Sequence, residues 1–431
     1  MENITEKDVI VIGAGLTGLT ASYYLKRSGK NFLTLEKAPR TGGVIHSVKE
    51  NGFVYEEGPN TGVIGNPEVA ELFEHLNNQV TPEYAGEEVK KRYVLKNEKW
   101  EQLPTGLMQA IRTPLFTLKD KLRILGEPFR RPGRNPNESL AELVNRRLGK
   151  SFLDYAIDPF ILGVYAGDPS MLVPKYALPK LYRIEQQYGS FIGGSVKKMF
   201  EKKDERNRKA TRQVFSVKGG LSNLTEALYR ESGSEKFLLD LREIKVKPMN
   251  GKFHVTVKQA EDKELKFIAG RVITTVGAYE LPNILPFISK AQLDRITTLY
   301  YTRVNEIVLG FDNWEGIPLD GFGGLVPHRE NQDILGVLFM SSFLKDRAPQ
   351  NGALLSVFMG GVRKPELADL SDDEIVSRLR FAFKKLMGLR EFNPDLIRIK
   401  RHRYAIPQYG ADSGERFAAV EQIELEHHGL F

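Results

Sequence analysis

The feature that most constrains the fold is the N-terminal segment of residues 7–29, KDVIVIGAGLTGLTASYYLKRSG, which has the pattern of a strand, a tight turn and a helix. Residues 9–12 form an unbroken β-branched run, which is typical of a parallel strand buried on both faces. The glycines of the turn, Gly13, Gly15 and Gly18, have the spacing G-x-G-x-x-G. In this order they permit the tight turn, a close approach of a bound group to the backbone, and packing of the helix on the strand.

The turn and the strand that follows together predict a dinucleotide site. The helix starts near Leu16 and Thr17, and a helix N-terminus presents free N–H groups and a positive dipole end to phosphate. The second strand, NFLTLE, ends on Glu36, 18 residues after Gly18, which is close to the spacing of a carboxylate that binds ribose hydroxyls. An acid at this position disfavours a 2′-phosphate.

A second pair of glycines favours FAD over a nicotinamide dinucleotide. Gly42 and Gly43 follow Glu36 closely, and they would allow a further close approach of the backbone to a longer cofactor. Residues 44–58 are then predicted to form a hairpin, which turns at its Asn-Gly pair and returns the chain toward the cofactor. The alternative is that the glycine pair lies in an ordinary loop.

Length and composition narrow the class of protein. At 431 residues the chain is too long for one core, and two or three domains are expected. It contains no cysteine, which excludes disulfides, thiolate metal sites and a flavin linked through cysteine, so the cofactor is expected to be noncovalent. The histidines are scattered along the chain, and neither a metal site nor a Ser-His-Asp arrangement is expected.

The absence of disulfides fits a cytoplasmic protein, either free or peripherally associated with a membrane. The net charge of +7 fits either an ordinary basic surface or an anionic partner. The N-terminus has no basic signal-peptide region, and no run reaches the roughly 18 apolar residues of a membrane-spanning helix. No nucleic-acid-binding motif is present, so a nucleic-acid partner is not expected.

The middle of the chain, residues 107–205, has helical periodicity that is cut by prolines, including Pro159. Basic side chains alternate there with Leu, Phe and Ile; they are Arg112, Lys119, Lys121, Arg123, Arg130 and Arg131. Two interpretations stay open. The region is either a solvated helical domain whose basic side chains lie along apolar surface, or a domain that docks on an anionic membrane.

Several segments of the chain resemble one family. The N-terminal motifs, VIVIGAGLTGLTASYYL, LEKAPRTGGVIHSV and GFVYEEGPNT, resemble the superfamily of FAD-dependent amine oxidases and protoporphyrinogen oxidases. The runs LPTGL, GVYAGD and GFGGLVP are more specific, and they resemble the oxygen-dependent protoporphyrinogen oxidase family. The similar segments, which are spread over nearly the whole chain, are residues 90–107, 161–172, 215–228, 321–330 and 403–409.

The resemblance implies a mixed α/β and α+β fold with three domains. A discontinuous Rossmann-type FAD-binding domain would comprise residues 1–80, 206–285 and 400–431. A sheet-based substrate domain would comprise residues 81–106 and 286–399, and residues 107–205 would form the helical, potentially membrane-docking domain. Because the family closes its flavin site with a further C-terminal segment and this sequence stops at HHGLF, we expect the chain to be truncated, which puts its FAD binding in doubt.

The resemblance also implies site residues. Those expected at the cofactor are Gly13, Gly15, Leu16, Thr17, Gly18, Glu36, Lys37, Arg40, Gly42, Gly43, Gly58, Pro59, Asn60, Thr61, Ile244 and Thr275. Arg92 would pair with a substrate propionate, Phe322 and Leu325 would clamp a macrocycle, and Gly163 would offer a backbone carbonyl near the reacting ring. No side chain is assigned as acid or base.

The implied reaction is the oxidation of protoporphyrinogen IX to protoporphyrin IX in heme biosynthesis. Three two-electron steps would each use FAD, and O2 would be reduced to H2O2. The alternatives are coproporphyrinogen III oxidation, another noncovalent FAD amine oxidase or desaturase, and a non-catalytic dinucleotide-binding or membrane-adaptor protein. The sequence does not indicate an oligomeric state.

Overall fold

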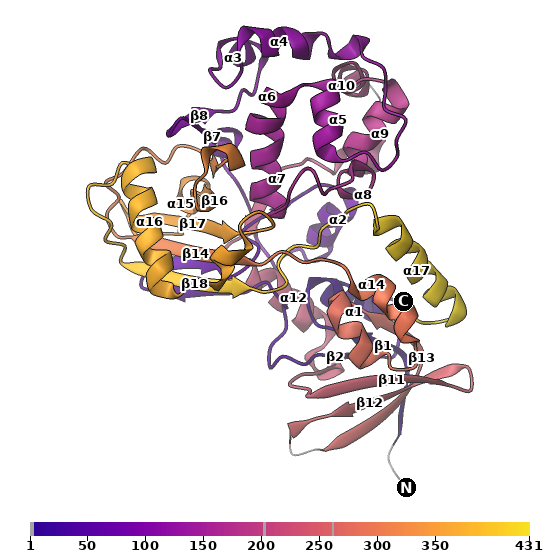
Figure 1. The fold of residues 1–431 in the computed structure, drawn as a ribbon. Helices are drawn as coiled ribbons and strands as arrows, with labels where there is room; N and C mark the ends of the chain where they lie inside the picture. Colours follow the sequence, from indigo (N-terminus) through magenta and orange to yellow (C-terminus); the bar gives the residue numbers. More distant parts are fainter. Residues whose placement is uncertain (1–3, 201–203, 261–262) are drawn as a thin grey trace.

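The computed structural model describes residues 4–200, 204–260 and 263–431, which fold into three adjoining regions (Figure 1). A small sheet with its helices lies at the bottom of Figure 1, a larger sheet lies at its left, and a group of helices forms the top. The larger sheet stands between the other two regions. The chain crosses between regions repeatedly, so each one is assembled from segments that are distant in sequence.

The smaller, six-stranded sheet contains the N-terminal strand. Its strands in spatial order are β10 (Phe237–Leu238), β2 (Phe32–Leu35), β1 (Thr5–Ile12), β13 (Glu264–Thr274), β12 (Lys252–Lys258) and β11 (Glu243–Met249). The first four are parallel neighbours, and β13, β12 and β11 pair antiparallel. Helix α1 (Leu16–Arg27) packs against both β2 and α12 (Ser222–Ser232). The predicted order of strand, helix and strand at the N-terminus is confirmed.

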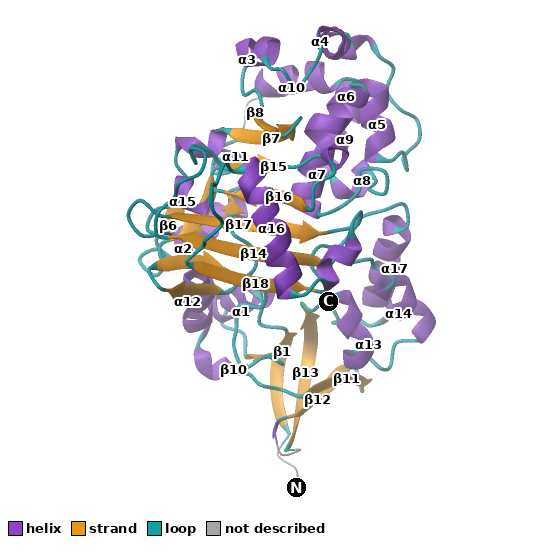
Figure 2. Cartoon of the chain, turned by 60° about the vertical axis from the view of Figure 1, so that its left-hand side comes forward, coloured by secondary structure: helices purple, strands orange, loops and turns teal. Residues whose placement is uncertain are grey.

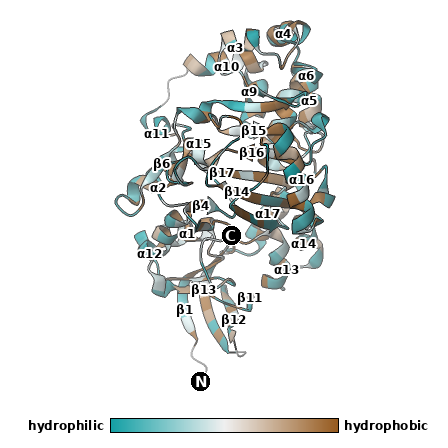
Figure 3. Ribbon diagram, turned by 90° about the vertical axis from the view of Figure 1, so that its left-hand side faces the viewer, coloured by the Kyte–Doolittle hydropathy of each residue, from teal (hydrophilic) through white to brown (hydrophobic). Residues whose placement is uncertain are grey.

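The larger, seven-stranded sheet has the order β18 (Leu396–His402), β14 (Val304–Phe311), β17 (Ala353–Gly360), β16 (Ile334–Leu338), β15 (Gly323–Leu325), β7 (Arg92–Lys96) and β8 (Lys99–Gln102). Its pairs are antiparallel except for the parallel pair of β15 and β7. Every residue of β14 is buried, and hydrophobic colours dominate the central strands in Figure 3. Helix α16 (Asp372–Leu386) packs its apolar face on this core.

Two small sheets connect these regions. The hairpin of β3 (Ser47–Glu50) and β4 (Phe53–Glu56) turns at Asn51 and Gly52, as predicted. Strands β5 (Gly62–Val63), β9 (Val214–Val217) and β6 (Pro82–Tyr84) form a three-stranded sheet next to α2 (Pro67–His75). The last residues of the chain, around Leu430, run beside β13 and exchange backbone hydrogen bonds with it.

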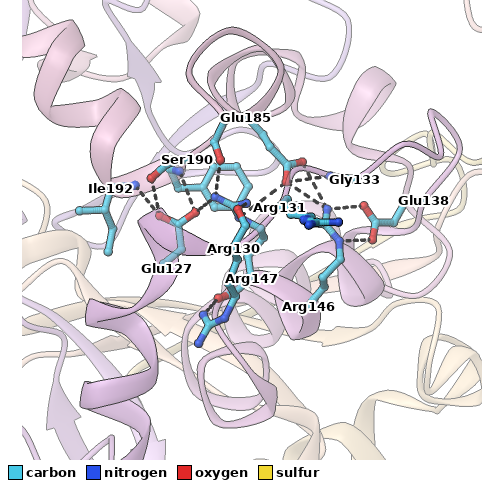
Figure 4. A network of polar contacts seen from close by, with 12 residues as sticks. Glu127, Arg130, Arg131, Gly133, Glu138, Arg146, Arg147, Glu185, Ser190 and Ile192 are labelled. Atoms are coloured by element: carbon cyan, nitrogen blue, oxygen red, sulfur yellow. Dashed lines mark hydrogen bonds and ion pairs between the residues drawn. The ribbon is translucent and has the colours of Figure 1, made fainter.

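The helical region is held together by a buried network of ions (Figure 4). Its helices are α3 (Leu107–Arg112), α4 (Leu118–Leu125), α5 (Leu140–Arg147), α6 (Lys150–Phe152), α7 (Asp158–Tyr165), α8 (Pro174–Ala177), α9 (Pro179–Tyr188) and α10 (Phe191–Phe200). Glu127 and Arg147 are both fully buried and paired with each other. Glu185 forms an ion pair of 3.0 Å with Arg146, which also forms an ion pair of 2.8 Å with Glu138. These pairs join α5 to α9 and to the turn after α4.

One proline does not interrupt its helix. Pro159 was expected to break the helical pattern, but the chain stays helical from α6 to α7 through a π-helical turn, Leu153–Ile157. A proline lacks the N–H group and collides with the carbonyl of the preceding turn, and a π turn is a known way to accommodate such a defect. Helix α7 therefore continues toward the larger sheet. The predicted domain ranges stay predictions, and β18 spans one of their boundaries, at residue 399.

Candidate active site

The glycine-rich turn after β1 is too tight for side chains. Gly13 has a φ of +102°, and a Cβ there would lie 2.6 Å from the Thr275 hydroxyl oxygen. A Cβ at Gly18 would collide with the Gly13 carbonyl. The Thr275 hydroxyl donates to the carbonyls of residues 12 and 13, at 2.9 and 3.1 Å, and so fixes the turn from β13. The turn leaves backbone N–H groups and the start of α1, at Leu16 and Thr17, facing any bound phosphate.

Glu36 lies at the carboxyl end of β2, beside this turn. Its carboxylate accepts hydrogen bonds from the N–H groups of Ala14, at 2.6 Å, and Ala38, at 2.8 Å. Each carboxylate oxygen has a second acceptor direction, so Glu36 can still receive ribose hydroxyls. The arrangement fits a dinucleotide whose pyrophosphate crosses the glycine turn.

The second glycine pair meets the first turn in space. Gly42 forms a parallel bridge with Gly15, and a Cβ at Gly43 would lie 3.0 Å from the Gly15 Cα. Arg40 shapes this crossing, because its guanidinium donates to the carbonyl of Gly43, at 2.8 Å, and to that of Ile45, at 3.2 Å. The two backbones lie side by side with no side chain between them. A longer dinucleotide requires such a surface, because it must approach the backbone closely at more than one point.

The other predicted cofactor residues are more dispersed. Lys37 forms an ion pair of 2.6 Å with Glu280. Ile244 is buried on β11, three residues after Leu241, whose N–H donates to the Glu36 carbonyl at 3.2 Å. Gly58, Pro59, Asn60 and Thr61 follow the hairpin and line a cavity that opens beyond the second glycine pair.

This cavity has a volume of about 460 Å³ and lies between the larger sheet and α7. One wall of the cavity is the segment of residues 58–61. The other wall is formed by strands β14, β15 and β16, by helix α7 and by the residues after β18. Most of its lining is apolar; the apolar residues include Phe160, Leu162, Val164, Leu335, Val337 and Phe358. A volume of this size is within the usual range for a small-molecule or cofactor site.

All four predicted substrate residues line the cavity: Arg92, Gly163, Phe322 and Leu325. The Arg92 guanidinium lies 5.2 Å from the centre of the Phe322 ring. Within the described residues, Arg92 is exposed and has no carboxylate partner. Gly163 on α7 faces Leu325 on β15 so closely that a Cβ at Gly163 would collide with the Leu325 side chain.

Two titratable residues of the cavity wall were not predicted. Glu306 on β14 has only 1% exposure, and its carboxylate accepts a hydrogen bond of 2.6 Å from Asn60 Nδ2. His402 Nε2, at the end of β18, lies 3.5 Å from the other Glu306 oxygen. Burial raises the pKa of Glu306, although His402 and Asn60 act in the opposite direction. The signal in the sequence was one acid within the apolar run RVNEIVLGF.

An ion-pair cluster fixes α7 against the larger sheet. Arg363, which follows β17, binds Asp158 at 2.5 Å and Asp168 at 2.8 Å. Burial works against the Asp168 charge, but hydrogen bonds from Arg363 and Ser170 lower the pKa of Asp168 to about 2. Asp158 also accepts the N–H of His328, which follows β15. The cluster keeps the two walls of the cavity at a fixed separation.

A comparison with known families defines the class of protein. The model of the flavin containing amine oxidoreductases matches residues 16–422, and the chain belongs to this family. It is an FAD-dependent oxidoreductase of mixed α/β fold, as the sequence predicted.

Relatives within the family narrow the resemblance. The chain is 29% identical to protoporphyrinogen oxidase 2 of Arabidopsis thaliana, over 100% of the chain and 90% of the relative. It is 30% identical to the chloroplastic protoporphyrinogen oxidase of Nicotiana tabacum, over 94% of the chain and 76% of the relative. It is also 26% identical to coproporphyrinogen III oxidase of Bacillus subtilis, over 98% of the chain and 92% of the relative. The resemblance to the protoporphyrinogen oxidase family is confirmed.

Solved structures share the fold. An Exiguobacterium protein provisionally assigned as a protoporphyrinogen oxidase superposes with a TM-score of 0.80 and 22% identity, covering 100% of this chain and 94% of its own. A reduced UDP-galactopyranose mutase superposes with a TM-score of 0.72 and 16% identity, covering 99% and 89%.

Proposed function

We propose that this protein oxidises protoporphyrinogen IX to protoporphyrin IX in three two-electron steps, with O2 as the final acceptor and H2O2 as its product. The observation that supports this function best is the cavity itself. Its walls are mostly apolar and it borders the segment of residues 58–61. At one side lies the Arg92 cation, which has no carboxylate partner in the part of the chain that the structure describes. A bulky apolar macrocycle with two carboxylates matches that combination.

The residues of the cavity have separate roles in this proposal. Arg92 binds one propionate through a charge-assisted hydrogen bond, while Phe322 and Leu325 hold the faces of the macrocycle. The backbone carbonyl of Gly163 lies near the reacting ring and orients it toward the flavin. The glycine turns would hold FAD, which would supply the hydride acceptor, while the protein orients the substrate carbon and excludes water. The apolar lining of the cavity directly helps to exclude water.

The FAD contacts are proposed from the same geometry. The turns at Gly13 and Gly42 receive the pyrophosphate and the ribityl chain, and Glu36 receives the adenosine ribose. Residues 58–61 frame the flavin at the cavity. The predicted contacts of Lys37 and Ile244 belong to the adenine end of this arrangement.

Coproporphyrinogen III is the second candidate, because the Bacillus subtilis relative is a coproporphyrinogen III oxidase. That substrate has four propionates in place of two. Among the described residues of the cavity lining, the side chains that can be positively charged are Arg92 and His402. This small number of cations favours the substrate with fewer carboxylates.

The test is a direct comparison of the two porphyrinogens. The protein is reconstituted with FAD, and porphyrin fluorescence and peroxide are followed anaerobically and in air. We expect protoporphyrin to form with the higher kcat/KM, and peroxide to appear at about one per two electrons only in air. A rate no higher than spontaneous oxidation for both substrates would remove the proposal, and a higher kcat/KM for coproporphyrinogen would reassign the substrate.

We further propose that the helical region docks on an anionic membrane surface. On α4 and the turns beside it, Leu118, Leu122, Leu125 and Phe129 are exposed, and Phe129 is 92% exposed. Basic side chains surround them; those that are themselves exposed are Arg112, Lys119, Arg123 and Arg131. In the described part of the chain, no helix has the length and apolar character needed to cross a bilayer.

Sedimentation with vesicles tests this docking. Vesicles that contain anionic lipid should pellet the protein at low salt, and high salt should weaken the effect because exposed charges are screened. The variant Phe129→Ser should pellet less. Leu425→Ser is the matched control, because Leu425 is 84% exposed but lies on α17 (Ser413–Glu426), outside the helical region. No pelleting at low salt would contradict the proposal.

A further inference from the structure

We propose that Glu306 and His402 form a proton-accepting pair, which takes the pyrrole N–H proton of the porphyrinogen in the two-electron oxidations that create a C=N bond. This inference rests on the proposed function, and it supplies the acid-base group that the sequence did not reveal. The pair is built by two neighbouring strands, β14 and β18, and both side chains face the cavity.

The register of the two strands brings the side chains together. Glu306 pairs with Lys400 across the ladder, and His402 lies two residues further along β18, on the same face. Glu306 Oε2 and His402 Nε2 are 3.5 Å apart. The imidazole is misaligned for a hydrogen bond, and His402 Nε2 has no hydrogen-bond partner among the described residues although the atom is buried. A buried polar atom without a partner that borders a cavity is available to a ligand.

The same pair is connected to the segment expected at the flavin. Asn60 Nδ2 donates to Glu306 Oε1 at 2.6 Å, and Asn60 Oδ1 accepts from the Ser356 hydroxyl at 2.9 Å. The second N–H of Asn60 donates to the Gly58 carbonyl at 3.1 Å. Asn60 therefore uses its whole amide to hold one carboxylate oxygen in place, and the other oxygen is left to His402 and the cavity.

Charged or titratable groups face Glu306 from several neighbouring elements, and Glu56 on β4 repels its charge. From β18 come His402 and Lys400, and the Lys400 ammonium binds Glu57 at 3.1 Å. From the end of the hairpin comes Glu57, whose charge raises the pKa of Glu306 further. Glu57 itself is paired with His46 at 2.9 Å. From β17 comes Ser356, which is uncharged. The carboxyl of Glu306 is thus biased toward binding a proton.

The proposed step balances in atoms and electrons. A methylene-bridge C–H bond breaks, and its hydrogen leaves with both electrons to the flavin. A pyrrole N–H bond breaks, its hydrogen leaves as a proton to the pair, and the electrons of that bond form a C=N double bond. The pair gains this proton, so its charge rises by one. The hydride and the stored proton together provide the two hydrogens that convert O2 to H2O2.

Rapid mixing of the FAD-loaded protein with porphyrinogen, without oxygen, measures this step. In the wild type we expect the rate of flavin reduction to rise with pH as the pair loses its proton. Glu306→Gln should lower the rate about 100-fold, in the range of general base catalysis, and abolish the rise. His402→Gln should lower it about tenfold and shift the rise. Unchanged rates and an unchanged pH profile in Glu306→Gln would overturn the inference.

Glu56→Gln is the matched control. Glu56 has the same exposure of 1%, and burial raises its pKa as it does for Glu306, but it lies outside the cavity lining, bonded to Ser47 and the Leu221 N–H. We expect its reduction rate at high pH to stay within about twofold of the wild type. The rise with pH should remain, shifted toward lower pH because the repulsion between Glu56 and Glu306 is removed. If Glu56→Gln loses the pH dependence as well, the effect is not specific to the pair, and the inference fails.

A measurement without turnover separates this inference from the proposed function. Infrared difference spectra of the protein without substrate, recorded while pH is varied, should contain the C=O band of a neutral carboxyl that is absent in Glu306→Gln. If the band is present but the protein oxidises neither porphyrinogen, the proposed substrate is wrong, whereas the titration of the Glu306–His402 pair is supported. Porphyrinogen oxidation by a wild type without the band would keep the function and overturn the pair.

Discussion

Glu127 and Glu306 are both almost completely buried, and they differ in how the fold satisfies their carboxyl groups. Glu127, in the helical region, accepts from Arg147, from the Ser190 hydroxyl at 2.6 Å, and from the N–H groups of Phe191 and Ile192 at 3.0 and 3.1 Å (Figure 4). Glu306, in the cavity wall, has one hydrogen bond, from Asn60, and the nearby imidazole of His402.

The pKa values of the two groups move in opposite directions. Burial opposes ionisation in both. At Glu127 the hydrogen bonds of Ser190, Phe191 and Ile192 outweigh burial and lower the pKa, whereas at Glu306 burial dominates and raises it. Burial alone therefore does not determine the role of an acid. The fully bonded carboxylate is a structural ion, and the partly bonded one is positioned to exchange a proton with a ligand.

The largest expected effect is the loss of stability in Glu127→Gln. An amide places an NH2 group among converging donors and removes the hydrogen-bonded carboxylate partner of the buried Arg147, which keeps only Glu185, 3.6 Å from its Nε. Breaking such a pair costs about 3–5 kcal/mol. Urea unfolding, together with hydrogen exchange in α5 and α10, measures this loss. Glu306→Gln is the comparison, because an amide there can turn its oxygen toward Asn60 and its NH2 toward His402. Equal destabilisation by Glu127→Gln and Glu306→Gln would contradict the proposed difference between the two carboxyl groups.

The second effect is a difference in the pH dependence of stability. Glu127, with its lowered pKa, contributes stability above the unfolded value of about 4.3, and this is lost as pH falls through its folded pKa. Glu306, with its raised pKa, favours folding below about 4.3, and this contribution is lost as pH rises through its folded pKa. The stability of Glu306→Gln relative to the wild type should therefore increase from pH 5 to 8, as thermal unfolding would reveal. A decrease over that interval would contradict the direction assigned to Glu306.

The third effect concerns the cations of the two regions. Arg147 is paired with a carboxylate of the protein, whereas Arg92 has no carboxylate partner among the described residues. Because Arg92 is therefore free to bind a propionate, Arg92→Ala should raise the KM for the porphyrinogen about tenfold, with little change in kcat. Lys91→Ala is the control, because the neighbouring ammonium is already paired with Asp320 at 2.9 Å. Steady-state kinetics with both variants measures the difference. An unchanged KM in Arg92→Ala would remove this residue from substrate binding.

The smallest expected effect is at Gly163. The added methyl of Gly163→Ala would push the Leu325 side chain into the cavity, because the two residues are in contact, and we expect kcat/KM to fall about fivefold, which corresponds to roughly 1 kcal/mol. Leu325→Ala should itself lower kcat/KM, because Leu325 holds the macrocycle, and the double variant should be no slower than Leu325→Ala alone. Gly106→Ala, where a Cβ meets no atom within 4 Å, is the control. A double variant slower than Leu325→Ala alone would indicate that the contact with Leu325 is not the cause.

Much of the fold was accessible from the sequence because its signals are local. The strand, the glycine turn, helix α1 and the strand ending on Glu36 are short-range features with fixed spacing. The hairpin at Asn51 was predicted for the same reason. Pro159 was misjudged, because whether a helix ends at a proline or absorbs it in a π turn depends on the packing on both sides of the helix.

The sequence by itself determined the dinucleotide turn, the position of Glu36 beside it, and, through the resemblance, the class of enzyme. The tertiary structure alone decided that Glu306 and His402, 96 positions apart, meet across β14 and β18 beside Asn60. The reason is physical: a glycine turn is specified by backbone sterics over a few residues, whereas the proton affinity of a buried carboxyl depends on which distant groups the strand register brings to it.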